Sequence, residues 1–155
     1  MDSKNYIPRS IENYAFDENL TGRHMVFIAG PRQVGKTLLA KNWLKRKGCA
    51  SLYFNWDEPS IRRAYLANSR FFESPARSLR TRDPWIVFDE IHKRNRWRDI
   101  LKGVYDSFND EFRFLTPSPN QGKRNGIFST GFMHPKVRQD SKTWWRLVYI
   151  GPARP

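Results

Sequence analysis

Short apolar runs alternate with amphipathic stretches along residues 1–115, which is the pattern of strands that alternate with helices. The first run, at 25–29, is continuously apolar, as expected of a strand covered on both faces of a parallel sheet. Further strands are expected at 51–55, 85–88 and 112–115. The alternation therefore predicts an α/β fold in which helices flank a parallel sheet.

The intervals between the runs carry helix signals. Residues 37–47 place their apolar side chains on one side, and they end in cations followed by Gly48, which is a typical helix stop. The strongest helical period lies at 97–108, where one face is apolar and the others are charged. Its apolar positions are Trp97, Leu101, Val104, Tyr105 and Phe108.

Two further helices are expected between the second and third strands. The segment 57–59, Asp-Glu-Pro, predicts a helix start with a capping carboxylate and a proline in the first turn. The buried face of this helix would consist of Ile61, Ala64 and Tyr65. The basic stretch 70–82 predicts another helix, which would pack on the sheet through Phe71, Phe72 and Leu79.

The pattern changes after residue 115. Residues 116–155 hold five of the ten prolines, four of the nine glycines and seven Lys or Arg, with Asp140 as their one acid. We therefore expect a core at 1–115 and an atypical basic tail at 116–155, which could add one strand at 146–150. Two interpretations of this tail stay open: a divergent fifth strand supplied by 147–150, or the frameshifted or truncated end of a longer gene product.

Length, composition and charge exclude some classes of protein and favour others. A chain of 155 residues suits one domain, and 39% hydrophobic with 15% aromatic residues excludes a disordered chain. No apolar run approaches the roughly 18 to 20 residues needed to cross a bilayer, so we expect a cytoplasmic protein without a membrane partner. Cys49 is the single cysteine and the three histidines are scattered, which excludes an internal disulfide and argues against a structural metal site. A net charge of +13 favours polyanionic partners.

One segment carries a specific chemical signal, because it follows the first strand and opens the first helix. Its residues are Gly30, Pro31, Arg32, Gln33, Val34, Gly35, Lys36 and Thr37, which fit the pattern G-x-x-x-x-G-K-[ST]. The glycines let successive backbone N–H groups point into one hollow that receives phosphate oxygens at a helix N-terminus, next to Leu38. Lys36 would neutralise the β- and γ-phosphates, and the Thr37 hydroxyl would bind Mg²⁺.

Asp89 and Glu90 at the end of the third strand supply the expected second half of this site. They follow the glycine-rich segment by about fifty residues. A carboxylate at such a strand end holds Mg²⁺ through water, and the next one polarises the attacking water. We therefore assign Asp89, with Thr37, to the metal, and Glu90, with Lys36, to catalysis of ATP hydrolysis.

These motifs resemble the prokaryotic AAA+ ATPases of the AAA_14 type, which are often paired with a DUF4143 domain. The resemblance rests on 30–37, on Phe88-Asp89-Glu90-Ile91-His92-Lys93, and on Trp97 with Leu101-Lys102-Gly103. It extends to Tyr6-Ile7-Pro8-Arg9 and to Tyr53-Phe54-Asn55-Trp56-Asp57 with Arg62-Arg63, so it covers about residues 6–115. It implies a P-loop NTPase core of the ASCE type, ATP and Mg²⁺ as ligands, and a Walker B strand beside the P-loop strand. Thr116 fills the first place of the family's Thr-Gly-Ser sensor, but 117–119 replaces the rest, so the fold is incomplete on its C-terminal side.

Two alternatives accompany the ATPase interpretation. The chain could be a nucleotide-binding fragment or pseudo-ATPase without turnover, since the sensor region is altered. It could be a basic nucleic-acid-binding module, in which Trp144 and Trp145, flanked by Lys142 and Arg146, stack on bases. ATPases of this class also form oligomers in which a neighbouring subunit completes the site with an arginine. No arginine of this sequence can be given that role.

Overall fold

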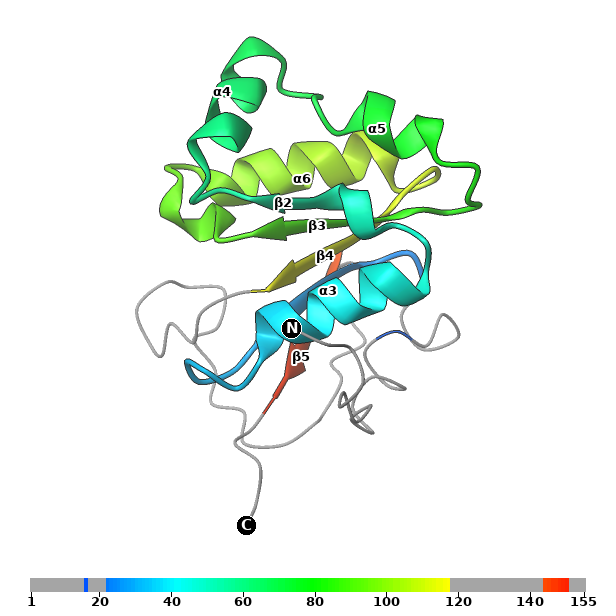
Figure 1. The fold of residues 1–155 in the computed structure, drawn as a ribbon. Coiled ribbons are helices and arrows are strands. Elements are labelled where there is room, and N and C mark those ends of the chain that lie inside the picture. Colours follow the sequence, from blue (N-terminus) through cyan, green and yellow to red (C-terminus); the bar gives the residue numbers. More distant parts are fainter. Residues whose placement is uncertain (1–15, 17–21, 118–143, 151–155) are drawn as a thin grey trace.

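The computed structural model describes Phe16, residues 22–117 and residues 144–150. Within these residues five parallel strands form one sheet, in the order β2-β3-β4-β1-β5 (Figure 1). The strands are β1 (Met25–Ala29), β2 (Tyr53–Asn55), β3 (Trp85–Asp89), β4 (Arg113–Pro117) and β5 (Trp145–Tyr149). The predicted α/β fold, a parallel sheet flanked by helices, is confirmed.

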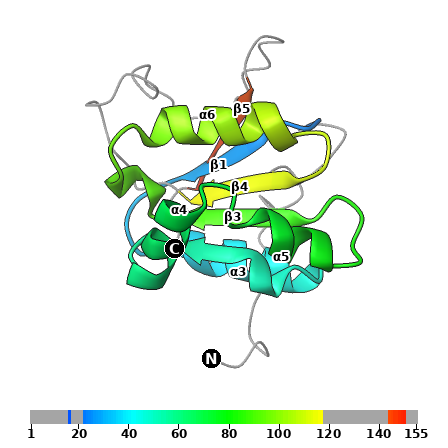
Figure 2. The same ribbon diagram turned by 90° about the horizontal axis from the view of Figure 1, so that it is seen from above.

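Helices cover both faces of this sheet. They are α3 (Lys36–Arg46), α4 (Pro59–Ala67), α5 (Glu73–Ser78) and α6 (Trp97–Phe108), with the short 3₁₀ helices η2 (Ala50–Leu52) and η3 (Ile91–Lys93). The view from above shows α6 on one face and α3 on the other, while α4 and α5 lie over the β2 edge (Figure 2). The helices at 37–47, 57–59 onward, 70–82 and 97–108 are all present, with bounds that differ by a few residues.

The structure corrects the predicted order of the strands. β4 lies between β3 and β1, and it pairs with both, so the strand that ends in Asp89 is not beside the strand that precedes the glycine-rich loop. β4 is buried along its whole length, as are β1 and β3, so all three are central strands with no exposed face. The hydrophobic pattern alone therefore cannot predict the order of these three strands in the sheet.

The face expected for α4 is the one that turns inward, since Ile61, Ala64 and Tyr65 are half-buried and the other residues of the helix are exposed. None of the three is fully buried, because the helix lies over the sheet edge. Its N-cap residue is Glu58, whose side chain makes no capping hydrogen bond. The neighbouring Asp57 instead forms an ion pair with Lys93, at 2.7 Å.

The core is rich in aromatic rings. Phe72, next to α5, is 1% exposed and packs its ring edge-on against Phe88 of β3 and Phe114 of β4. In α6, Leu101 and Phe108 are buried, and the other three expected apolar positions are partly buried against the same core. These contacts fix α5 and α6 against the strands that carry the acidic pair.

β5 supplies the strand expected at 146–150. It pairs with β1 in parallel register, from Met25 opposite Trp145 to Ala29 opposite Tyr149. β4 continues to Pro117, so residues on both sides of the expected 115/116 boundary contribute to one sheet. Most of the predicted basic tail, at 118–143 and 151–155, lies outside the described residues.

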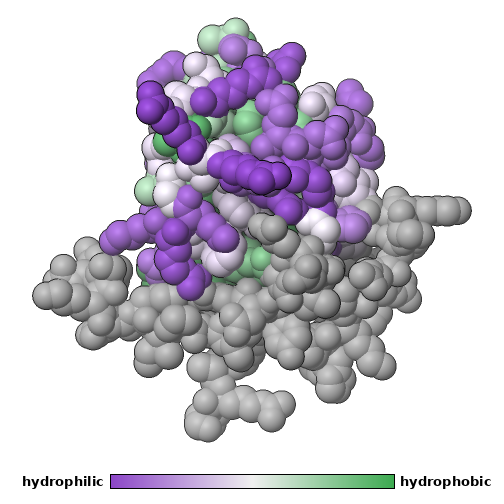
Figure 3. Space-filling view, turned by 90° about the vertical axis from the view of Figure 1, so that its right-hand side faces the viewer, coloured by the Kyte–Doolittle hydropathy of each residue, from purple (hydrophilic) through white to green (hydrophobic). Residues whose placement is uncertain are grey.

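The described surface is predominantly polar. The side of the molecule on the right of Figure 1 carries mainly hydrophilic side chains, with small apolar areas between them (Figure 3). Among the described helices, none has the length and apolar character that a bilayer crossing requires.

Candidate functional site

The glycine-rich loop connects the end of β1 to the start of α3. A Cβ atom at Gly30 would lie 2.3 Å from the backbone oxygen of Ile150, just beyond β5, so only glycine fits there. Ile150 also donates its backbone N–H to the Ala29 carbonyl, at 2.7 Å. Gly35 is the N-cap of α3 and has the left-handed φ of 85°, which glycine adopts without steric cost. The two glycines thus shape the loop for two different physical reasons.

Lys36 folds back over this loop. Its Nζ donates hydrogen bonds to the carbonyls of Gly30 and Pro31, at 2.6 and 2.7 Å. Burial lowers the pKa of Lys36, and the negative charges of Asp89 and Glu90 oppose that shift. Both carboxylates are therefore close enough to act on the ammonium group, as the predicted site requires.

The rest of the loop is accessible. Arg32, Gln33, Thr37 and Leu38 are exposed, whereas Val34 is half-buried against the core. Leu38 is one of the large apolar side chains on the described surface, at 47% exposure. A ligand can therefore reach the predicted phosphate-binding residues.

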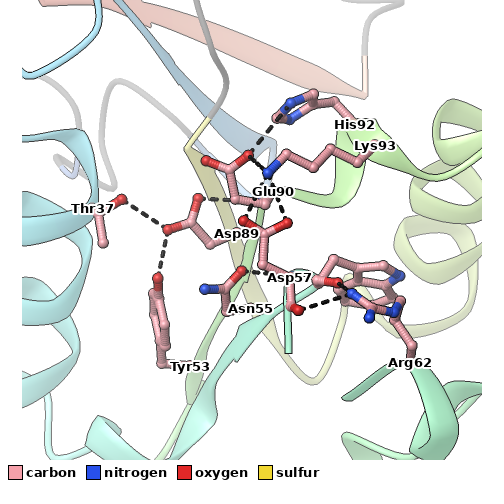
Figure 4. Close-up of polar contacts among 10 residues, drawn as sticks. Thr37, Tyr53, Asn55, Asp57, Arg62, Asp89, Glu90, His92 and Lys93 are labelled. Carbon is pink, nitrogen blue, oxygen red and sulfur yellow. Dashed lines mark hydrogen bonds and ion pairs between the residues drawn. The ribbon is translucent and has the colours of Figure 1, made fainter. Parts of the chain in front are cut away.

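Asp89 is the best-held acid of the site. It is 3% exposed, and its carboxylate accepts three hydrogen bonds (Figure 4). The hydroxyls of Thr37 and Tyr53 donate to Oδ2, at 2.9 and 2.5 Å, and the backbone N–H of Glu90 donates to Oδ1, at 2.9 Å. Burial and the bond to Asp89 raise the pKa of Tyr53 far above its usual range, so its hydroxyl stays a donor.

The path of α3 explains how Thr37 reaches Asp89 although β4 separates their strands. The helix starts at the end of β1 and packs across the sheet face against β4 and β3. Its first turn therefore lies over the end of β3, where Thr37 and Asp89 form their hydrogen bond. The crossing helix, not adjacency of strands, assembles the site.

Glu90 is held by weaker and more exposed contacts. Its backbone has the left-handed φ of 58°, and its Oε2 lies 3.2 Å from Lys93 Nζ and 3.5 Å from His92 Nε2. Lys93 also contacts both oxygens of Asp57 at 2.7 Å, and these hydrogen bonds raise its pKa, so it is a cation. Burial lowers the pKa of His92, against the attraction of Glu90. The side chains of Glu90 and Lys93 are 34% and 52% exposed.

Comparison with known families agrees with this geometry. A family model described as AAA domain (AAA_14) matches residues 22–130, more than half of the chain. The chain belongs to this AAA domain family. Among curated proteins, none matches the sequence. Membership indicates a nucleotide-binding function of the ATPase type at the level of the family, and the parallel sheet is the fold expected of such a domain.

The oxygen atoms at the candidate site of this AAA domain suit Mg²⁺ that is bound together with a nucleotide. Mg²⁺ is usually bound by one or two protein oxygens together with phosphates and water. Thr37 Oγ1 could provide one such oxygen, and the neighbouring Asp89 carboxylate could hold a water of the ion, beside the Lys36 ammonium. In the part of the chain that the structure describes, no group of three or more His, Cys, Asp or Glu side chains could hold a metal by itself. The ion would depend on the nucleotide for its remaining ligands.

Sequence reasoning assigned no role to three residues of this site, namely Tyr53, His92 and Lys93. For Tyr53 the sequence showed only half of the relevant relationship, namely that Tyr53 precedes Asn55 by two positions. The other half is that Asn55 of β2 is the register partner of Asp89. Alternate residues of a strand share a face. The pairing of β2 with β3 was needed before that relationship could be used, and the ion pairs of Lys93 depend on the turn that follows Glu90.

Proposed function

We propose that this AAA domain binds ATP with Mg²⁺ and hydrolyses it. The proposal rests on the hydrogen bond of 2.9 Å between Thr37 and Asp89, which joins the glycine-rich loop to the acid at the end of β3. In this proposal the backbone N–H groups within 30–38, to which Pro31 contributes none, bind the phosphates at the start of α3. Lys36 would exchange its two loop carbonyls for β- and γ-phosphate oxygens, which are stronger partners for an ammonium group.

Thr37 and Asp89 would hold the metal. Bound Mg²⁺ neutralises charge on the β- and γ-phosphates. Thr37 contributes a hydroxyl oxygen, and Asp89 contributes a buried carboxylate that the fold has already oriented. The protein thus provides the metal side of the site before any ligand arrives.

Glu90 would act as the general base toward the attacking water. Its carboxylate is partly exposed and paired with Lys93, so it can take up a proton without leaving a buried charge unpaired. Thr116 near the end of β4, which fills the first place of the sensor motif, would orient the same water. Its Oγ1 is buried and has no hydrogen-bond partner among the described residues, which suits a group that awaits a ligand.

The nucleic-acid alternative finds less support. Trp144 and Trp145 pack edge-on against Phe27 of β1, and Trp144 also contacts Tyr105 of α6. Both tryptophans are half-buried against the core, so they do not form an open surface on which bases could stack. Lys142 lies outside the described residues. Homo-oligomer formation and a cytoplasmic location stay predictions.

The test measures nucleotide binding and turnover separately. The unaltered protein should bind a fluorescent ATP analogue more tightly with Mg²⁺ than with EDTA, and it should release phosphate from ATP. Lys36→Ala should weaken binding, whereas Glu90→Gln should keep binding and lower turnover by about 100-fold or more, the scale of general-base catalysis. Lys45→Ala, an exposed cation on the same helix, is the matched control and should change neither property.

The outcomes separate the competing functions. Binding with no turnover in the unaltered protein would favour the pseudo-ATPase. Absence of Mg²⁺-dependent binding would refute the proposal. Salt-sensitive binding of single-stranded DNA that survives Lys36→Ala would favour the nucleic-acid module instead.

A further inference from the structure

We propose that Tyr53 is a positioning residue for Mg²⁺, whose hydroxyl holds the Asp89 carboxylate in the orientation that the metal needs. The inference deepens the proposed function and rests on it. Tyr53 would touch neither the nucleotide nor the ion, because its hydroxyl is already engaged with Asp89 Oδ2 at 2.5 Å. Its effect would reach the metal only through Asp89.

The location of Tyr53 makes this bond a consequence of the fold. Tyr53 begins β2, and its neighbour on the same face of the strand, Asn55, is paired with Asp89 in the parallel register. The Tyr53 ring lies beneath α3, with Lys41 Nζ 4.6 Å from the ring centroid. The ring is thus fixed between the strand and the helix that carries Thr37, and its hydroxyl points to the acid between them (Figure 4).

The hydrogen bonds of Asp89 show what the hydroxyl contributes. A carboxylate offers about four acceptor positions, two on each oxygen. The hydroxyls of Thr37 and Tyr53 fill both positions of Oδ2, and the Glu90 N–H fills one on Oδ1. One position on Oδ1 therefore remains for a water that belongs to the metal. Without the Tyr53 hydroxyl, a second position opens and only Thr37 and the Glu90 N–H still orient the carboxylate.

Loss of a hydrogen bond to a carboxylate ligand weakens metal binding in other proteins by about 10- to 100-fold. Thr37 would bind the ion directly, so its substitution cannot isolate the orientation of Asp89. Tyr53 can be changed with less disturbance, because phenylalanine keeps the ring and its packing and removes only the hydroxyl. Tyr53→Phe is therefore the informative variant.

The experiment titrates Mg²⁺ at a fixed concentration of a fluorescent ADP analogue, so that no turnover is involved. For Tyr53→Phe we expect the Mg²⁺ concentration at half-saturation to rise about tenfold. Binding of the same analogue in EDTA should be unchanged, because the phosphate-binding loop is intact. Tyr65→Phe is the matched control: Tyr65 packs its ring against Trp56 near the same sheet edge, and the control should bind Mg²⁺ like the unaltered protein.

Each result bears on a different claim. If the unaltered protein shows no Mg²⁺-dependent binding, the proposed function itself fails. If it does, but Tyr53→Phe and Tyr65→Phe have the same Mg²⁺ dependence, only the positioning role fails. If Tyr53→Phe loses affinity equally with Mg²⁺ and with EDTA, Tyr53 is structural and the inference is overturned.

Discussion

The two adjacent acids of the site are held in opposite ways. Asp89 is 3% exposed, and donors from α3, β2 and the following turn fix its carboxylate. Glu90 is one-third exposed, and among the described residues its side chain forms ion pairs with His92 and Lys93. The adjacent residues Asp89 and Glu90 therefore form a rigid side and an adjustable side of the site, respectively.

The difference matches the two tasks that we propose. A side chain that is oriented in advance binds a metal more tightly, because the entropy of ordering it is lost during folding and not on binding. A general base has to exchange its partner for water and then release a proton. Exposed ion pairs contribute little to stability, so the contact with Lys93 can open at small cost. The site thus combines a preformed metal side with a base that can move.

The largest effect is expected when Asp89 is replaced and the stability of the protein is measured without nucleotide. Asp89→Ala removes the acceptor of three hydrogen bonds and leaves the hydroxyls of Thr37 and Tyr53 without it. We expect the free energy of unfolding to fall by about 2–4 kcal/mol, measured by denaturant titration. Glu90→Gln should change it by less than about 0.5 kcal/mol. Equal losses in the two variants would contradict the contrast between the acids.

An intermediate effect is expected at Gly30, where the loop meets the end of β5. In Gly30→Ala the new methyl group collides with the Ile150 carbonyl, a backbone atom that cannot rotate away. The free energy of unfolding should fall by about 1–3 kcal/mol. Gly103→Ala is the matched control, because nothing lies within 4 Å of a Cβ there. Since Gly103 lies inside α6, alanine should stabilise the protein by up to about 1 kcal/mol.

The sequence was most informative where a feature is local. The strand at 25–29 and the loop that follows it could be predicted, because their apolar run and glycine spacing are contiguous. Asp89 could be predicted from its place after an apolar strand. The strand order could not, since β1, β3 and β4 are all fully buried central strands. The AAA family match is consistent with the fold but does not test individual site residues.

Features that depend on register or on a turn were missed. Tyr53 reaches Asp89 only because β2 pairs with β3 and α3 crosses above them. Lys93 approaches Glu90 and Asp57 because a left-handed residue starts the 3₁₀ turn. Neither relationship has a fixed spacing in the sequence. The acids could be found from their pattern, whereas the contacts that distinguish them required the structure.

The smallest expected effect concerns the pH response of the adjustable side, through His92. Burial lowers the pKa of His92 from 6.5; Glu90, Asp89 and Asp57 oppose this shift, while Lys93 adds to it. The unfolded chain therefore binds a proton at a higher pH than the folded protein does. The stabilising contribution is complete above pH 6.5 and is lost as the pH falls through the lower pKa of the folded state.

Replacement of His92 by a residue without an imidazole should remove this loss of stability at low pH. Nδ1 of His92 is buried without a hydrogen-bond partner among the described residues, so a second ring proton would have no acceptor there. We expect the denaturant midpoint of the unaltered protein to fall more between pH 8 and pH 5 than that of His92→Gln. His24→Gln controls for the loss of a histidine elsewhere. A steeper fall in His92→Gln would mean that the pair with Glu90 outweighs burial, and the Glu90 side would then be held more firmly than its exposure implies.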